Sequence, residues 1–224
     1  NSKRTIYYNR EISSQLYEQL RDYIVTNNIS LNILFMTALY ILIAKYSSIN
    51  DIVIGSPVSG KVLADLEEMI GSFINSLPIR YKVDPSKTIL ETIEDVKKQV
   101  MDALENQEYP IDSIVSDKNK ENTEIASLFD IMFVMQTNFK QGEQEKSNQI
   151  FLDYQEIPID SKMNLIVEGI DFGNTVKFQI TYPVELYDDD SIIQLMDSFL
   201  QVIESIIQND RRYVKEIEII SQDQ

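Results

Sequence analysis

The chain has 224 residues, 43% of them hydrophobic, and its 36 acidic and 20 basic residues give a net charge of −16. This length allows one large domain or two small ones, with enough apolar residues for a sizeable core. The acidic balance disfavours nucleic acid and anionic membranes as partners, because contacts with phosphate need clustered Lys and Arg.

The sequence contains no cysteine and no histidine. The lack of cysteine excludes disulfides and thiol chemistry, and it is compatible with a reducing cytoplasm, the location that we expect. The lack of histidine excludes Ser-His-Asp and Cys-His catalytic arrangements and the common zinc sites within this chain. Only carboxylates, lysine, tyrosine or hydroxyl groups remain for catalysis, and we expect no metal site.

Hydrophobic periodicity predicts strands interleaved with helices over the first half of the chain. The longest apolar run, Ile33–Ala44, follows a potential cap at Ser30 and is interrupted only by Thr37. It is shorter than the ~20 residues that span a bilayer, so it predicts a helix buried against a sheet. In chain order we expect a strand at Thr5–Asn9, a helix from Ser13 or Ser14 to Asn27, the buried helix to Tyr46, an interior strand at Asp51–Pro57, a strand ending near Val83, a helix from Thr88 that Tyr109-Pro110 ends, and one helical turn at Asp112–Val115.

In the second half, Phe129–Gln136 is almost continuously apolar, which predicts a strand buried on both faces. Thr175–Tyr182 alternates strictly between apolar and polar residues, as in the half-buried strand of a hairpin. Lys140–Gln149 is charged and poor in apolar residues, which predicts an easily cleaved surface loop. We also expect strands at Ile150–Tyr154 and Met163–Ile170, a helix from Asp188–Asp190 to Gln208, and a short closing strand within Arg212–Ile220.

This order of elements predicts a single α/β domain over residues 1–224, with a mixed sheet and helices packed mainly on one face. Ser56, Ser59 and Ser72 have no histidine to activate them, so we interpret them as structural hydroxyls. The Asp188–Asp190 run lacks the spacing and the glycine of a calcium loop, and it fits the positive end of a helix dipole better.

The stretch from Met69 to Arg80 contains the strongest functional candidates. Gly71 suits a bend or a close approach of the backbone, and the period of two in a strand places Phe73 and Asn75 on one side. A buried amide without a partner costs about 1–3 kcal/mol, so Asn75 needs one. Either Asn75 closes a turn within this chain, or its partner belongs to another subdomain or to a substrate.

Four stretches in register resemble the condensation domains of nonribosomal peptide synthetases. Ile70, Gly71, Phe73, Asn75, Leu77 and Arg80 fill every specified position of the motif Ile-Gly-x-Phe-x-Asn-x-Leu-x-x-Arg. The other three are Gly55-Ser-Pro57-Val58-Ser-Gly60-Lys61, similar to Gly-x-Pro-Val-x-Gly-Arg; Asn106-Gln-Glu-Tyr109-Pro110-Ile-Asp112, similar to His-Gln-Asp-Tyr-Pro-Phe-Glu; and Leu128-Phe129-Asp-Ile-Met-Phe-Val-Met-Gln136, similar to Leu-Phe-x-x-Met-Phe-x-x-Gln.

The resemblance covers the second half of such a domain and implies a chloramphenicol-acetyltransferase-like half-fold. The family's catalytic motif, His-His-x-x-x-Asp-Gly, belongs to the first half and is absent here. The resemblance therefore implies a C-terminal subdomain that is inactive alone. In an intact domain it would take part in amide-bond formation between two carrier-bound thioesters during antibiotic or other secondary-metabolite biosynthesis.

The implied partners are the N-terminal half, carrier proteins with their phosphopantetheine arms, and an adjacent adenylation domain. This half would supply a channel wall, bridging loops and part of a carrier-docking surface. The implied channel residues are Asn75, Phe73, Gly71 and Gln136, and the implied structural residues are Gly55, Pro57, Gly60, Arg80, Tyr109 and Pro110.

Departures from the motifs leave the condensation subtype open. Lys61 replaces Arg, Asn106 replaces His, and Ile111 and Asp112 replace Phe and Glu. A non-catalytic docking module of a synthetase is the alternative, and an intact histidine motif upstream would distinguish the two. A free-standing coenzyme A-dependent acyltransferase is disfavoured because it too needs a histidine. The Gly-Trp-Phe-Thr motif of epimerization domains is absent.

Overall fold

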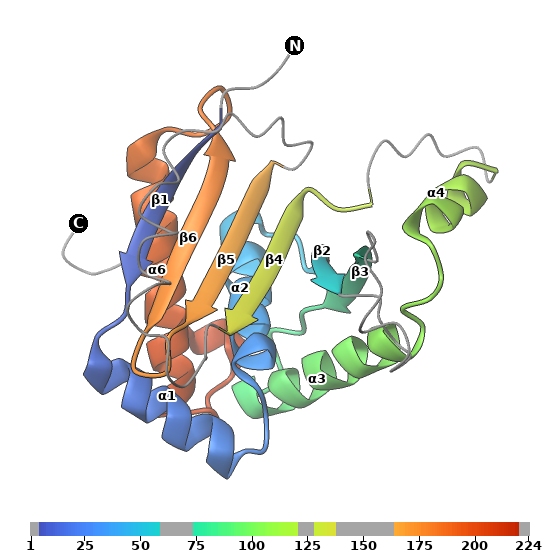
Figure 1. The fold of residues 1–224 in the computed structure, drawn as a ribbon. Helices are drawn as coiled ribbons and strands as arrows, with labels where there is room; N and C mark the ends of the chain where they lie inside the picture. The colour runs from blue at the N-terminus through green and yellow to red at the C-terminus, as the bar shows by residue number, and fades with distance from the viewer. Residues whose placement is uncertain (1–4, 59–73, 121–127, 138–163, 220–224) are drawn as a thin grey trace, which may run out of the picture.

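The computed structural model describes residues 5–58, 74–120, 128–137 and 164–219. These residues form a six-stranded mixed sheet in the order β1-β6-β5-β4-β2-β3, with its helices packed mainly on one face and the helix Ile111–Lys120 beyond the β3 edge (Figure 1). The strands are β1 (Thr5–Glu11), β2 (Asp51–Val58), β3 (Asn75–Lys82), β4 (Ile131–Thr137), β5 (Leu165–Asp171) and β6 (Val176–Pro183). The helices are α1 (Ser14–Thr26), α2 (Leu31–Ser47), α3 (Ile89–Glu105), α4 (Ile111–Lys120) and α6 (Asp189–Gln208). The predicted α/β architecture is thus confirmed.

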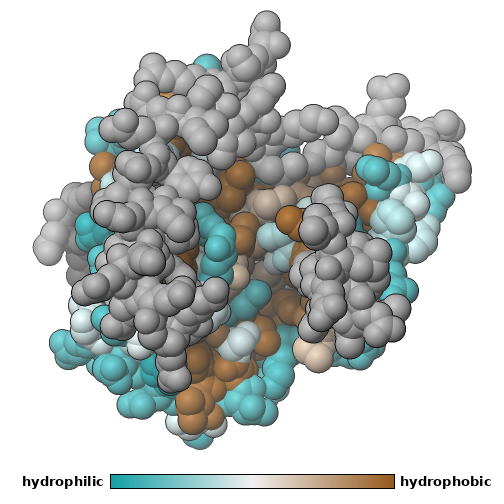
Figure 2. Space-filling model, viewed as in Figure 1, coloured by the Kyte–Doolittle hydropathy of each residue, from teal (hydrophilic) through white to brown (hydrophobic). Residues whose placement is uncertain are grey.

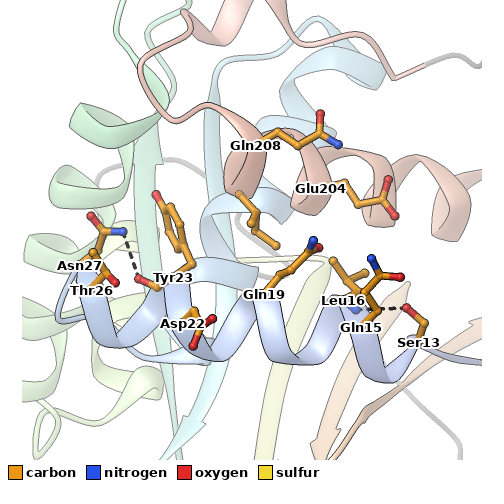
Figure 3. Close-up of a pocket in the computed structure, with 11 residues that line it drawn as sticks. Ser13, Gln15, Leu16, Gln19, Asp22, Tyr23, Thr26, Asn27, Glu204 and Gln208 are labelled. Atoms are coloured by element: carbon orange, nitrogen blue, oxygen red, sulfur yellow. Dashed lines mark hydrogen bonds between the residues drawn. The ribbon is translucent and has the colours of Figure 1, made fainter.

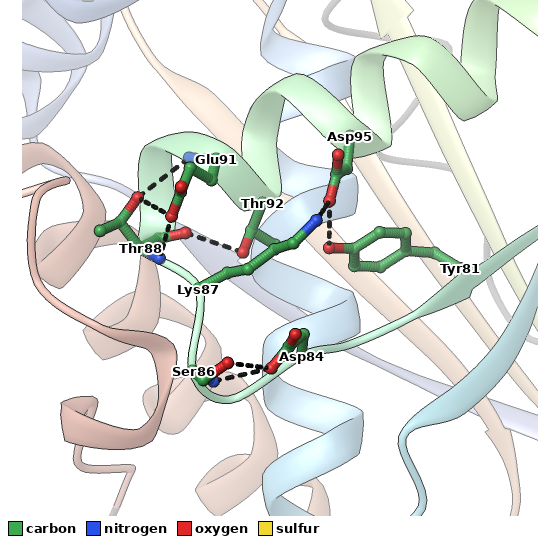
Figure 4. A network of polar contacts seen from close by, with 8 residues as sticks. All are labelled: Tyr81, Asp84, Ser86, Lys87, Thr88, Glu91, Thr92 and Asp95. Atoms are coloured by element: carbon green, nitrogen blue, oxygen red, sulfur yellow. Dashed lines mark hydrogen bonds and ion pairs between the residues drawn. The ribbon is translucent and has the colours of Figure 1, made fainter.

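Side-chain caps define where the main helices begin. The hydroxyls of Ser13 and Ser30 accept the backbone N–H groups of Leu16 and Ile33, as the sequence predicts for the first two helices. The α3 helix begins with a reciprocal capping box between Thr88 and Glu91 (Figure 4). The same close-up shows Asp95 on the next turn, bound to Lys87 at 2.6 Å and to the Tyr81 hydroxyl at 3.2 Å, which fastens α3 to β3.

The apolar helix α2 lies at the centre of the core, behind the sheet in the view of Figure 1. It packs against α6, α3 and the strands β2 and β4. Its Phe35 ring meets the Phe178 ring of β6 edge-on, with the centroids 4.9 Å apart, and the Tyr40 hydroxyl donates to the Ile79 carbonyl at 2.6 Å. Because α2 contacts strands from β6 to β3 across the sheet, the prediction of a deeply buried helix is confirmed.

The sheet has an uneven junction between β2 and β4. These parallel strands share two residue pairs, Ile54 with Ile131 and Gly55 with Met132, whereas β4 and β5 share seven and β2 and β3 share eight. The prediction that β2 is an interior strand is confirmed. The β2–β3 pair is therefore joined to the rest of the sheet mainly through the helices beneath it and this short contact.

Several predictions need correction. The apolar strand β4 is not buried on both faces: Phe133 is fully buried against the helices, but its neighbours Met132 and Val134 are only partly buried. The reason is that the described helices cover one face of the sheet only. The predicted turn at Asp112–Val115 is the longer helix α4, and the predicted closing strand is a 3₁₀ turn, Val214–Glu216, with one isolated bridge between Thr88 and Tyr213.

The hairpin of β5 and β6 is confirmed, with Gly173 at a φ of 88° in its turn and with alternating burial along β6. The predicted loop Lys140–Gln149 and strand Ile150–Tyr154 lie outside the described residues. Within the described part of the chain, no single helix is long and apolar enough to cross a membrane; α1 and α2 pass that test only as a pair, bent by 105°.

Candidate functional site

Two of the sequence motifs meet where Phe129 covers Gly55. A Cβ atom built on Gly55 would lie 2.1 Å from Cε2 of the Phe129 ring, far inside van der Waals contact. Phe129 precedes β4 and is 6% exposed, and Gly55 is one of the two β2 residues that pair with β4. The glycine therefore lets the ring close over the short junction.

Asn75 joins the other two motifs. Its side-chain amide donates to the carbonyl of Gln107 at 2.7 Å and lies 3.5 Å from the carbonyl of Tyr109, while its Oδ1 accepts from the Ser76 N–H at 2.9 Å. Of the two alternatives for Asn75, the structure shows a partner within this chain, and its place on a channel wall stays a prediction. Asn75 binds the connection between α3 and α4 within this chain and fixes that connection to the start of β3.

Arg80 holds a carboxylate on the neighbouring strand. Its Nε and Nη2 donate to the two carboxylate oxygens of Asp51 at 2.8 and 2.6 Å, in a bidentate arrangement. The hydrogen bonds from Arg80 lower the pKa of the Asp51 carboxyl below its ordinary value. Both side chains are exposed, so the pair fixes the alignment of β2 and β3 at the surface rather than forming a buried charge.

Gln136 and Asn75 lie at the same end of the sheet but on opposite faces. The side chains that point toward the helices include the paired residues Ile54, Ile79 and Ile131. Because side chains alternate along a strand, Asn75 lies on the same face as Ile79 of β3, and Gln136 lies on the opposite face from Ile131 of β4. Gln136 is exposed, and its side-chain amide donates to the carboxylate of Glu168 on β5. The structure therefore does not bring these two predicted channel residues together.

Of the remaining predicted residues, Pro57 lies on β2 beyond the short pairing with β4. Pro110 accepts the Ser113 N–H at 3.0 Å at the start of α4, and the Tyr109 hydroxyl donates to Asp117 at 3.0 Å, so both shape the α3–α4 connection. Gly60, Gly71 and Phe73 lie outside the described residues.

Glu168 is an ionisable residue in this region that the motifs did not identify. It lies on the face of β5 that the described helices leave open, and burial raises the pKa of its carboxyl, an effect that the hydrogen bond from Gln136 partly offsets. Figure 2 views this face and shows apolar side chains of described residues in its middle, among polar ones. The signal available in the sequence was a charge within the apolar residues of β5, ahead of the Asp171 that ends the strand.

A separate groove lies between α1 and α6, away from the motifs (Figure 3). Gln19 and Asp22 of α1 and Glu204 and Gln208 of α6 line it, and Gln19 points across it toward α6. Its lining contains amides and carboxylates but no Lys or Arg. The Tyr23 hydroxyl in its wall is already bound to Asp210 at 2.9 Å, so the groove offers polar contacts without an activated nucleophile.

The described residues contain no group of three or more Asp or Glu side chains that could hold a metal ion. With no histidine in the sequence, the arrangement can position substrates and donate or accept hydrogen bonds. The motifs themselves mostly serve to hold β2, β3, β4 and the α3–α4 connection together.

Comparison with known proteins agrees with the family that the motifs resemble. The family model described as "Condensation domain" matches residues 2–224. The chain is 30% identical over 212 residues to gramicidin S synthase 2 of Brevibacillus brevis, covering 94% of this chain but 5% of that protein.

The fold is similar to that of two solved structures. Holo-AB3403, a four-domain nonribosomal peptide synthetase bound to AMP and glycine, superposes with a TM-score of 0.84 at 17% identity, over 98% of this chain and 18% of that one. The X-domain in its complex with OxyB from teicoplanin biosynthesis gives a TM-score of 0.80 at 18% identity, over 98% of this chain and 49% of that one. Because the family model spans nearly the whole sequence and the fold agrees, this chain belongs to the condensation domain family.

Proposed function

We propose that this chain is the C-terminal half of a condensation domain of a nonribosomal peptide synthetase. Together with an N-terminal half, it forms an amide bond: the amine of an acceptor attacks the thioester of a donor, both substrates being held on carrier proteins by phosphopantetheine arms. This half contributes a wall of the channel, loops that reach the other half, and part of the carrier-docking surface. An adenylation domain is the expected neighbour in the same synthetase.

The observation that carries this proposal is the family match over residues 2–224 in a chain that has no histidine. The chain covers only 49% of the X-domain chain that it resembles, which fits one of two halves. A chain without the histidine motif is expected to act by positioning, and holding two reacting groups end to end can by itself lower a barrier by several kcal/mol.

The contacts at the motifs support a division of roles within this half. Gln136, exposed on the face that the described helices leave open, suits the channel wall. Asn75 acts through the α3–α4 connection that it holds, and its place on the channel wall beside Phe73 and Gly71 remains a prediction. Gly55 and Arg80 maintain the strands on which the channel residues stand.

A non-catalytic docking module is the second candidate function. The observation that favours it is the similarity to an X-domain whose structure was solved in complex with OxyB. An intact His-His-x-x-x-Asp-Gly motif in the preceding sequence favours catalysis, and a degenerate one favours docking.

The test uses the 224-residue chain, its N-terminal half and two loaded carrier proteins. We expect no peptide above background from either half alone and peptide formation when the halves are combined or fused. The control combines this chain with an N-terminal half in which both histidines of the His-His-x-x-x-Asp-Gly motif are replaced. Turnover by this chain alone would contradict the half-domain assignment, and folded, associated halves without turnover would favour the docking module.

A further inference from the structure

A row of polar side chains crosses the face of the sheet that the described helices leave open. The register of the antiparallel pairs places Asn9 of β1 opposite Gln179 of β6, and Gln179 opposite Glu168 of β5. Residues directly opposite each other in a sheet project from the same face, so all three share the face of Gln136. Gln136 extends the row from β4 by its hydrogen bond to Glu168.

In this row one acceptor lacks a donor and one carboxylate lacks a cation. The Oδ1 atom of Asn9 is buried and has no hydrogen-bond partner among the described residues. Glu168 accepts from Gln136 but forms no ion pair with any Lys or Arg among the residues that the structure describes. Buried acceptors normally find partners, and a partly desolvated carboxylate without a cation is costly. The row therefore has unused capacity for a ligand that donates hydrogen bonds.

No charged side chain on this face stands directly opposite Glu168 in the register of the described strands. Lys177 of β6 lies one pair further along the same face and stands opposite Glu11 of β1 rather than opposite Glu168. Gln136 on β4 and Gln179 on β6, which flank Glu168, carry no charge, and Tyr7 of β1 lies opposite Thr181. A primary amine supplies what is missing, because its ammonium form offers three donors and a positive charge.

We infer that Glu168, held in place by Gln136, binds the amine of the acceptor substrate. This inference rests on the proposed function for the identity of the amine, while the site itself rests on the contacts above. The carboxylate would accept hydrogen bonds from the amine and orient its nitrogen. Glu168 is thus a binding residue that the family motifs do not include.

Titration of the 224-residue chain with glycinamide, a small primary amine, tests the site. We expect saturable changes in the carbon-13 signal of the Glu168 carboxyl and a lower pKa of that group when the amine is bound. N-acetylglycinamide, which keeps the amide but lacks the amine, should produce neither change. The variant Glu168→Gln keeps the size of the side chain and an acceptor for Gln136, and it should bind glycinamide at least about tenfold more weakly, as the loss of a charge-assisted hydrogen bond predicts.

Glu94→Gln provides the matched control, because Glu94 is exposed on α3, far from the row in sequence and on the other side of the sheet. It should bind like the unaltered chain. Equal responses to both probes, or unchanged binding by Glu168→Gln with a normal circular dichroism spectrum, would overturn the inference.

A second experiment separates this inference from the proposed function. In a reconstituted domain that forms amide bonds, Glu168→Gln should raise the KM for the acceptor more than it lowers kcat. If the domain is active and the variant behaves like the parent, the inference fails while the function stands. If glycinamide binds at Glu168 but the complete domain forms no amide, the proposed function fails and the amine site stands.

Discussion

The Phe129 ring lies directly over Gly55, so closely that a Cβ at residue 55 would be 2.1 Å from its Cε2 atom. These residues come from two sequence motifs more than seventy positions apart, and they meet where β2 and β4 share only two residue pairs. The ring takes the place that a side chain would occupy on an ordinary strand. The junction between the two parts of the sheet thus depends on a missing Cβ and on one aromatic ring.

Replacement of Gly55 by alanine should destabilise the fold. The added methyl group must displace the Phe129 ring, which is packed and cannot move freely, and overpacking of this kind costs about 1–3 kcal/mol. Urea unfolding measures the change in free energy. The double variant Gly55→Ala/Phe129→Leu should recover part of the loss, because the two changes relieve the same contact.

Gly169→Ala is the control for this prediction. A Cβ at Gly169 would lie 2.9 Å from the sulfur of Met135, a flexible side chain, and 3.2 Å from Cε1 of Phe178. Its cost should be smaller than that of Gly55→Ala, because methionine adapts to irregular space. If Gly169→Ala lowers the free energy of unfolding as much as Gly55→Ala does, or more, the contact between Gly55 and Phe129 is not critical for stability.

Replacement of Asn75 by alanine should destabilise the isolated chain, because Asn75 is the hydrogen-bonded link between β3 and the α3–α4 connection. Its removal leaves the Gln107 carbonyl and the Ser76 N–H without these bonds, at a cost of about 1–3 kcal/mol. Thermal and urea unfolding of the chain measure it.

Asn106→Ala serves as the comparison for Asn75. The side chain of Asn106 donates a single exposed hydrogen bond to the Asp102 carbonyl at the end of α3. Asn106→Ala should therefore change the free energy of unfolding by no more than about 0.5 kcal/mol. If Asn75→Ala leaves the stability of the chain unchanged but impairs condensation by a complete domain, Asn75 belongs to the channel wall instead.

The pKa of Asp51 should lie below its ordinary value of ~3.9 and should rise when Arg80 is replaced by lysine. A lysine keeps the charge but cannot donate the two parallel hydrogen bonds. Since the folded-state pKa is the lower one, the pair stabilises the fold above the unfolded-state value, and this contribution disappears as the pH falls through the folded-state value. Carbon-13 NMR titration of the Asp51 carboxyl measures its pKa in the parent chain and in the Arg80→Lys variant. The control is Arg10→Lys, which alters the separate ion pair with Asp197 and should leave the pKa of Asp51 unchanged.

The raised pKa of Glu168 should give the opposite pH dependence. Its folded-state pKa lies above the unfolded value of ~4.3, so the folded chain binds this proton more tightly. The resulting stabilisation is complete below the unfolded-state value and is lost as the pH rises through the folded-state value. Glu168→Gln should therefore gain stability relative to the parent chain as the pH rises over that interval, when the free energy of unfolding is measured in urea at a series of pH values. A constant difference across the series would contradict a raised pKa.

The sequence by itself determined the local elements and the family. The caps at Ser13, Ser30 and Thr88 start their helices because a side-chain oxygen satisfies a free N–H within three residues, a property of the local sequence. The period of two along β6 likewise predicted its burial, since alternate side chains of a strand face opposite sides. The motifs identified the family for the same reason: each is a contiguous run of residues.

Tertiary structure alone decided which motifs meet and which faces are covered. Asn75 finds Gln107 thirty-two positions away, and Gln136 finds Glu168 at the same separation, because sheet register and helix packing set those contacts. The apolar run of β4 could not reveal that its second face lacks a helix, because hydrophobicity reports a preference for burial and not what covers the strand. The charge of Glu168 inside an apolar run is visible in the sequence, but only the register shows that it lies opposite Gln179 and in one row with Asn9, since adjacency across strands is not encoded in any local pattern.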